Sequence, residues 1–214
     1  MSVHRAKFFI IILFLSSFII CQNELDMSSY ENLNEWEIIQ ETDVNLKWTN
    51  QNGFPVVRAT AKMPFPIDSI SKIIEDVKNY PNVFKRIHGV QILDKNIIHI
   101  MLDMPFLLSD RDYVIQYSKN KSKTTWKFSF NAINHKGAPV TEKYVRLINA
   151  FGKWELSPTN ENETLLVYTW NGELLGDFPE FALKRAWKTQ GNEIIHWIKA
   201  VSYTHLTLPT IYSV

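Results

Sequence analysis

Alternating hydrophobic and polar residues dominate the middle of this 214-residue chain and predict a series of β-strands. Gly, Pro, Asn and Asp residues separate the alternating segments. The predicted strands cover residues 36–39, 44–48, 56–63, 90–93, 97–104, 112–117, 125–131, 144–148, 152–156 and 165–174. Because they follow one another closely, they are most simply antiparallel neighbours in one curved sheet.

A first helix is predicted between the third and fourth of these strands. Its buried face has apolar residues at positions i, i+3, i+4 and i+7, namely Ile70, Ile73, Ile74 and Val77. Asp68 or Ser69 can cap its N-terminus, and Tyr80 followed by Pro81 is expected to end it.

A second, longer helix is predicted after the last strand. Asp177 can cap it, and Pro179 suits the first turn because its missing N–H would have no partner there. Gly191 costs roughly 1 kcal/mol relative to Ala in mid-helix, which indicates either close packing or a harmless surface position. The inner face contains Leu183, Ala186, Trp187, Gln190, Gly191, Ile194, Ile195 and Ile198. Strands followed by a long amphipathic helix predict an α+β fold.

Length and composition are those of one globular domain. A domain of about 100 to 200 residues is expected, and 45% hydrophobic residues are enough for a core. The 23 basic and 22 acidic residues give a formal net charge of +1 without a basic cluster. This balance argues against a nucleic-acid partner, and we expect a monomer.

Residues 1–21 are predicted to be a signal peptide. Arg5 and Lys7 precede the apolar run 8–20, which is the pattern of a secretory leader. As a helix the run would rise about 20 Å, whereas a bilayer core is about 30 Å thick. We therefore expect export, to a periplasmic location. An uncleaved membrane anchor is one alternative, and a lipoprotein modified at Cys21 is another, although a large residue precedes that cysteine.

Residues 201–214 have a different origin in this interpretation. The peptide V-S-Y-T-H-L-T-L-P-T at 201–210 can be encoded by the end sequence of a transposon adapter used for sequencing libraries. Its β-branched residues and Pro209 also break the preceding helical pattern. We expect the segment to be an adapter-derived artefact without native packing.

Two short motifs carry a resemblance to a known family. The first is D-V-K-N-Y-P at 76–81, and the second is M-P-F-L-L-S-D-R-D-Y-V at 104–114, where an apolar turn and a charged cluster precede a strand. Together with the order of elements over 34–200, they resemble the START domain (StAR-related lipid-transfer domain) of the helix-grip superfamily, in a bacterial exported form. The resemblance implies a curved antiparallel sheet wrapped around a long C-terminal helix, with an internal hydrophobic cavity.

Strand alternation indicates which side chains face this helix. In the family, the gap between sheet and helix holds a lipid, and the opening lies between the helix start, here 177–181, and adjoining loops, here 133–141. Without the resemblance, the same residues could simply fill a solid core. The cavity candidates are Ile98, Ile100, Leu102, Tyr113, Ile115, Tyr117, Trp126, Phe128, Phe130, Trp187, Gln190 and Ile194.

The charged cluster Asp110, Arg111 and Asp112 is interpreted as structural. A general acid/base pair needs surroundings that separate the two pKa values, and the sequence around these carboxylates provides none. We expect Arg111 to tie the start of its strand to a nearby carboxylate or carbonyl. Sterol-carrying relatives have a second arginine six residues further on, where this chain has Tyr117, so an uncharged polar group suits the interior better.

Other chemistries find little support in the sequence. The histidines are dispersed, no H-E-x-x-H or G-x-S-x-G motif is present, and we expect no metal, no cofactor and no catalytic residue. The leading prediction is binding, and transfer or sensing, of a lipid or other hydrophobic small molecule, with transient membrane contact. The alternative is a polyketide cyclase or aromatase of the same superfamily that uses the cavity as a reaction chamber.

Overall fold

The fold is described from a computed structural model, over residues 35–105 and 107–207, with side chains as far as Thr204. The predicted signal peptide at 1–21 and the last residues of the tail lie outside this range. Among the described residues, no helix has the length and apolar character needed to cross a membrane.

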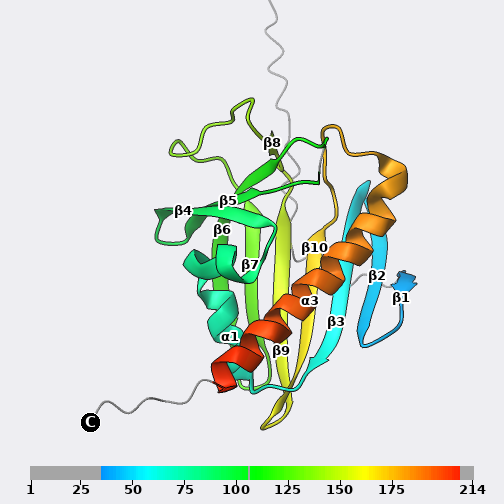
Figure 1. Cartoon of the computed structure of the whole chain (residues 1–214), viewed down its shortest axis with the longest axis vertical. Helices are drawn as coiled ribbons and strands as arrows, with labels where there is room; N and C mark the ends of the chain where they lie inside the picture. The colour runs from blue at the N-terminus through cyan, green and yellow to red at the C-terminus, as the bar shows by residue number, and fades with distance from the viewer. Residues whose placement is uncertain (1–34, 106, 208–214) are drawn as a thin grey trace, which may run out of the picture.

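One sheet contains all the strands, and Figure 1 shows α3 crossing it diagonally. The sheet order is β1-β2-β3-β10-β9-β7-β6-β5-β4, and every neighbouring pair along this path is antiparallel. The strands are β1 (Glu37–Gln40), β2 (Val44–Gln51), β3 (Phe54–Met63), β4 (Ile87–Asp94), β5 (Ile97–Leu102), β6 (Arg111–Lys121), β7 (Trp126–Ala132), β8 (Val145–Arg146), β9 (Phe151–Asn160) and β10 (Glu163–Asn171). The predicted curved antiparallel sheet is confirmed.

The short strand β8 differs from the prediction over 144–148. It has two residues and pairs in parallel with β6, off the main path. The N–H groups of Val145 and Leu147 donate to the carbonyls of Asp110 and Asp112, so this segment is attached to the start of β6. The alternation of its side chains correctly predicted extended backbone, but it could not indicate whether the segment runs parallel or antiparallel to its neighbour.

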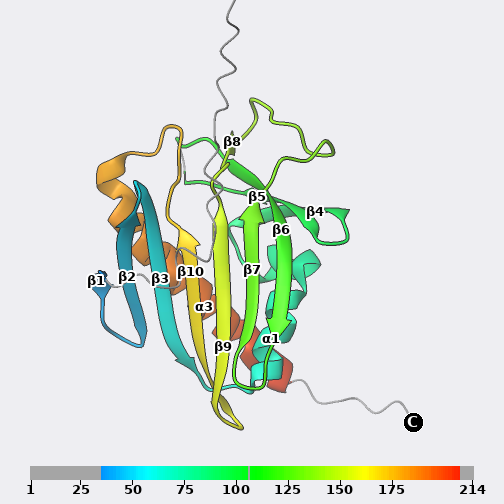
Figure 2. The same ribbon diagram turned by 180° about the vertical axis from the view of Figure 1, so that it is seen from behind.

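The helices are α1 (Ile67–Glu75), η2 (Val77–Asn79) and α2 (Tyr80–Val83) between β3 and β4, then η3 (Glu180–Ala182) and α3 (Leu183–Thr207). All lie on the same side of the sheet, and Figure 2 shows the strands in front of them when the molecule is seen from behind. The core lies between α3, α1 and the inner face of the sheet. This is the helix-grip arrangement.

The first helix has the predicted buried face but different ends. Ile70, Ile73 and Ile74 are buried, as predicted. The N-cap is Pro66, without a side-chain capping bond, rather than Asp68 or Ser69. The helix ends at Glu75, and the Tyr80–Pro81 pair that was expected to end it begins α2 instead, because proline has the backbone angle of a first helical turn.

The start of the C-terminal helix was also predicted wrongly. Asp177 is not its cap, since Pro179 precedes η3 and α3 begins only at Leu183. The carboxylate of Asp177 accepts hydrogen bonds from Ser109 and Arg111 instead, because the segment between β10 and η3 lies beside the start of β6.

The other end of α3 continues to Thr207, beyond the predicted break after Ala200. Ser202 is fully buried, and the ring of Tyr203 packs edge-on against Phe65 with 4.7 Å between centroids. The expectation that residues 201–214 have no packing is therefore wrong for 201–204. Their adapter origin stays a prediction.

Gly191 is a position of close packing. An added Cβ would lie 2.3 Å from Cδ2 of Leu46 in β2, which is far inside van der Waals contact. Of the two interpretations of this mid-helix glycine, the structure therefore supports the first.

Candidate ligand cavity

A cavity of ≈ 340 Å³ lies between α3 and the upper half of the inner sheet face, the half where β6 begins and β10 ends. This volume is within the range of about 300–1,000 Å³ typical of small-molecule sites. Its wall comes from α2, from β5, β6, β7, β9 and β10, from the loops at one end of the sheet and from α3. Aromatic side chains contribute strongly to it, including Phe84, Tyr113, Phe130, Trp154, Tyr168 and Trp170.

Most of the predicted cavity residues do line this space. They lie on β5, β6, β7 and α3, and their side chains face inward from each element. The eight are Ile100, Leu102, Tyr113, Ile115, Tyr117, Phe130, Gln190 and Ile194.

Four predicted residues, Ile98, Trp126, Phe128 and Trp187, lie outside the cavity. Ile98 and Phe128 belong to the solid core with the buried face of α1. Trp126 packs against that core from its edge, with Nζ of Lys121 4.1 Å from its ring centroid. Alternation assigns these residues to the correct face, but the cavity occupies only part of that face.

Trp187 is displaced from the cavity for a different reason. Its indole Nε1 donates to the carbonyl of Gly172 at 2.7 Å, and its ring lies 5.1 Å from that of Trp48. It therefore attaches α3 to β2 and to the end of β10.

A continuous row of stacked rings forms part of the wall. Trp154 stacks on Tyr168 at 3.8 Å and on Phe84 at 6.3 Å, and Tyr168 stacks on Trp170 at 4.9 Å. None of these four was among the predicted residues. The alternation of inward side chains in β9 and β10 was the signal that could have found three of them.

Phe130 completes this surface because its neighbour is glycine. A Cβ at Gly152 in β9 would lie 2.3 Å from Cζ of Phe130, so the ring lies over the backbone of the next strand. The ring of Tyr113 is nearly parallel to it, with centroids 6.4 Å apart and an angle of 11°.

Four tyrosines bring hydroxyl groups to the cavity: Tyr80, Tyr113, Tyr117 and Tyr168. Burial raises the pKa of each phenol well above its usual range, so all four are uncharged at neutral pH. Tyr80 and Tyr117 donate to the same acceptor, the carbonyl of Ile74, at 2.6 and 3.3 Å. Tyr117, which stands where sterol-carrying relatives have their second arginine, thus directs its hydroxyl to the backbone.

Two charged groups at the cavity have hydrogen-bond partners that the structure defines closely. Nε and Nη2 of Arg86 donate to both carboxylate oxygens of Glu193 in α3, at 2.6 and 2.8 Å. These hydrogen bonds raise the pKa of Arg86. Glu173 accepts from Asn149 at 2.9 Å. Arg86 and Glu193 also attach the middle of α3 to the segment before β4.

Arg111 joins the start of β6 to the loop between β10 and α3. Its guanidinium is fully buried and donates to the carbonyls of Ser109, Leu174 and Leu175 and to Oδ1 of Asp177. The sequence predicted that Arg111 would bind a nearby carboxylate or carbonyl, and the structure places both kinds of group around it. The backbone N–H of Ser109 lowers the pKa of Asp177, so the ion pair persists into mildly acidic solution.

Asp112 is enclosed by two cationic or polar partners. Arg146 contacts both its oxygens at 2.8 Å, and Nε2 of His99 lies 2.7 Å from Oδ2. Burial alone would raise the pKa of Asp112, but the hydrogen bonds from Arg146 and His99 outweigh it and lower the pKa. Asp112 is therefore a permanent carboxylate in a structural network rather than a proton donor.

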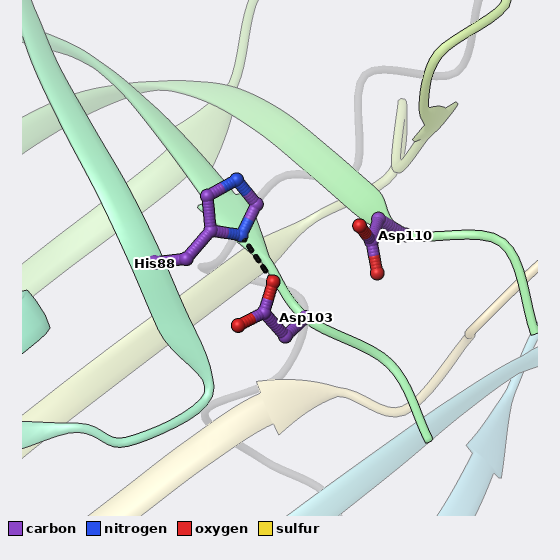
Figure 3. Close-up of side chains that lie close together, drawn as sticks. All are labelled: His88, Asp103 and Asp110. Atoms are coloured by element: carbon purple, nitrogen blue, oxygen red, sulfur yellow. Dashed lines mark ion pairs between the residues drawn. The ribbon is translucent and has the colours of Figure 1, made fainter. Parts of the chain in front are cut away.

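The folded chain also brings together His88, Asp103 and Asp110, which the sequence did not predict. Figure 3 shows the three side chains close together. Their possible ligand atoms lie within 4.8 Å of one another, and Asp103 is also a lining residue of the cavity. Nδ1 of His88 pairs with Asp103 at 2.6 Å, and Oδ1 of Asp110 accepts from the N–H of Met104. Within the described residues, these are the side chains whose spacing could hold a metal ion, but each has a hydrogen bond that orders the loop before β6.

Comparison with solved structures shows which fold this is. Human StAR-related lipid transfer protein 5 superimposes with a TM-score of 0.75 and 14% identity over 84% of this chain and 92% of that one. A STAR-related lipid transfer protein from Xanthomonas axonopodis gives 0.69 and 14% over 79% and 99%. An aromatase/cyclase from a Streptomyces species gives 0.54 and 14% over 73% and 98%.

No family model and no curated protein matches this sequence. At such low identity the structural matches show the fold alone. The chain has the helix-grip fold of START lipid-transfer domains, as predicted from its two motifs.

Proposed function

We propose that this protein binds a lipid or a similar hydrophobic molecule in the cavity under α3 and carries it. The observation that supports this proposal best is the ≈ 340 Å³ space with its aromatic wall inside an otherwise filled core. Each CH₂ group that enters it from water gains about 0.8 kcal/mol, so a chain can be held without covalent chemistry. The lipid-transfer proteins that share the fold support the same function.

Transient contact with a membrane would deliver the ligand. Leu107, Val140, Ile148 and Phe181 are large apolar side chains that are 62–92% exposed. They lie on the loops between β5 and β6 and between β7 and β9 and on the short helix η3 before α3, segments that Figure 1 shows at the same end of the molecule. Apolar groups exposed together in this way are typical of interaction surfaces, and they border the lining residues of the cavity.

Export is part of the proposal. The basic residues and apolar run before residue 21 support a mature chain that begins near Gln22 outside the cytoplasm. N-terminal sequencing of the protein from its own host tests this, and an intact Met1 in the soluble cytoplasmic fraction would contradict it.

A second candidate function is a reaction chamber of the aromatase/cyclase type. The Streptomyces aromatase/cyclase shares the fold, and the buried phenols could orient a polyketide. Mass spectrometry of a bound ligand before and after incubation with the protein separates the two functions. A ligand unchanged in mass and in chromatographic retention supports carriage. A product of equal mass and altered retention, or one lighter by one water for each aldol ring closure followed by dehydration, supports cyclisation.

The carrier proposal is tested by filling the cavity from one helix. Ala186 lines the cavity, and Ala200 on the same helix is exposed. We expect Ala186→Trp to abolish saturable binding of a fluorescent lipid and Ala200→Trp to leave it unchanged. Native mass spectrometry of protein purified from its host would name the ligand class. A wild type that binds no lipid would overturn the proposal.

A further inference from the structure

We propose that Tyr113 and Tyr168 form a polar subsite inside the cavity, which selects an uncharged ligand with a hydroxyl or carbonyl oxygen over one with a free carboxylate or phosphate. This inference rests on the proposed carrier function and names the ligand chemistry of that site. Neutral lipids with a hydroxyl group and lipids with an ester or ketone oxygen share this chemistry.

The four cavity tyrosines differ in what their hydroxyls contact. Those of Tyr80 and Tyr117 donate to the backbone at Ile74. For Tyr113 and Tyr168 no hydrogen bond to another described residue is found, and burial is the main cause of their raised pKa values. Two phenols are therefore available to a ligand, whereas the other two serve the fold.

The two hydroxyls are open to the cavity. A phenol can donate one hydrogen bond and also accept, and neither hydroxyl oxygen is among the fully buried side-chain atoms without a partner in the described residues. The side chain of Tyr168 is 7% exposed, and its ring is fixed between Trp154 and Trp170. A rigid, nearly buried donor that borders an open space is a ready partner for a ligand oxygen.

The two phenols approach the space from different strands. Tyr113 is on β6 and Tyr168 on β10, with β7 and β9 between them in the sheet. Phe130 on β7 lies beside Tyr113, with its ring over Gly152 on β9. A ligand that lies over Phe130 therefore has a phenol on each side, and its polar end is held while its apolar part contacts the aromatic wall.

The charges around the cavity disfavour an anionic head group in its interior. Arg86 lines the cavity, but its Nε and Nη2 already donate to the carboxylate of Glu193. Arg185, the other lining arginine, is on the exposed side of α3 near its start. A carboxylate beside Tyr168 would lose its water without gaining a cation, which is strongly unfavourable.

Three probes with the same hydrocarbon chain test the subsite: 1-hexadecanol, hexadecane and hexadecanoate, each supplied from a cyclodextrin complex at about pH 8, where a free carboxyl is ionised. Binding is followed by native mass spectrometry and tryptophan quenching. We expect hexadecanol to bind about tenfold more tightly than hexadecane, and hexadecanoate more weakly than hexadecanol.

Matched variants assign the effect to the two phenols. Tyr113→Phe and Tyr168→Phe should each reduce hexadecanol affinity several-fold and leave hexadecane affinity unchanged. Tyr144→Phe is the control, because the hydroxyl of Tyr144 contacts His88 outside the cavity. Thermal unfolding verifies that each variant is folded.

The outcomes separate the two proposals. If all three probes bind equally, or hexadecanoate binds most tightly, the subsite is wrong and the carrier function stands. If the phenylalanine variants keep the full preference for hexadecanol, the subsite is also wrong. If no probe binds, the carrier function fails and the subsite with it.

Discussion

The two halves of the inner sheet face are built from the same strands and yet differ in whether they are filled. In the lower half, Phe128, Leu156 and Leu166 are fully buried in the core beneath α1 and α3. Phe130, two residues after Phe128 on β7, and Tyr168, two residues after Leu166 on β10, line the cavity instead. A β-strand pattern determines which face a side chain takes, and the placement of helices determines whether that face is packed or hollow.

The hollow half is bordered by two arginines that join separate elements. Arg111 attaches the β10–α3 loop to β6, and Arg86 attaches α3 to the segment before β4. These contacts surround the cavity with charge-assisted hydrogen bonds, which are stronger than neutral ones. The filled half consists mainly of apolar side chains, and Glu75 at the end of α1 pairs there with Lys119 and Lys121 at the far end of β6. The difference predicts that binding and stability can be separated by substitutions in the two halves.

The largest difference is expected for Phe128→Ala compared with Phe130→Ala. Phe128 is fully buried in solid core, so truncation leaves a new cavity and should lower the free energy of unfolding by about 3 to 5 kcal/mol. Phe130 already borders a cavity, and its truncation should cost only about 1 to 2 kcal/mol. Urea denaturation measures both. Equal losses would show that the cavity half is packed as tightly as the core.

Removal of residues 201–214 should have the next largest effect. Ser202 is buried, and Tyr203 packs on Phe65 beneath the last turns of α3. We expect truncation after Ala200 to lower the melting temperature by several degrees, equivalent to roughly 2 kcal/mol. A Tyr203→Ala variant should account for part of this loss, and lipid binding should persist in both proteins. An unchanged melting temperature would instead agree with an adapter-derived segment that contributes nothing to the fold.

The cavity half should also have its own response to alkaline pH. The pKa of Tyr168 is raised in the folded protein, so above the usual tyrosine pKa of about 10 the unfolded chain loses a proton that the folded chain keeps. Stability therefore falls as pH rises through that range, by roughly 1 kcal/mol per such phenol at about pH 11. Tyr168→Phe should remove this part of the loss between about pH 9 and pH 11, while Tyr144→Phe should not. Parallel curves for the wild type and Tyr168→Phe would show that the phenol is not shielded.

Sequence patterns could predict the strands, the long helix and the face that each strand buries. They identified eight cavity residues because inward-facing positions follow from period two. They could not identify where the cavity stops, since Phe128 and Phe130 lie on the same face of β7 and differ only in how other elements pack against them. Nor could they find the contact between Asp177 and Arg111, because the partners are far apart in sequence and meet only when two loops close the same end.

The smallest effect is expected on α3, where one helix serves both halves. Gly191→Ala places a methyl group 2.3 Å from Leu46. The overpacking costs about 1 to 3 kcal/mol, and the better helix propensity of alanine offsets about 1 kcal/mol of it, so a net loss of about 1 kcal/mol in unfolding free energy is expected with ligand affinity retained. Ala186→Leu faces the cavity and should do the reverse, with stability nearly unchanged and lipid affinity reduced. If Gly191→Ala is instead more stable than the wild type, Leu46 has room to move, and the packed half is looser than its burial indicates.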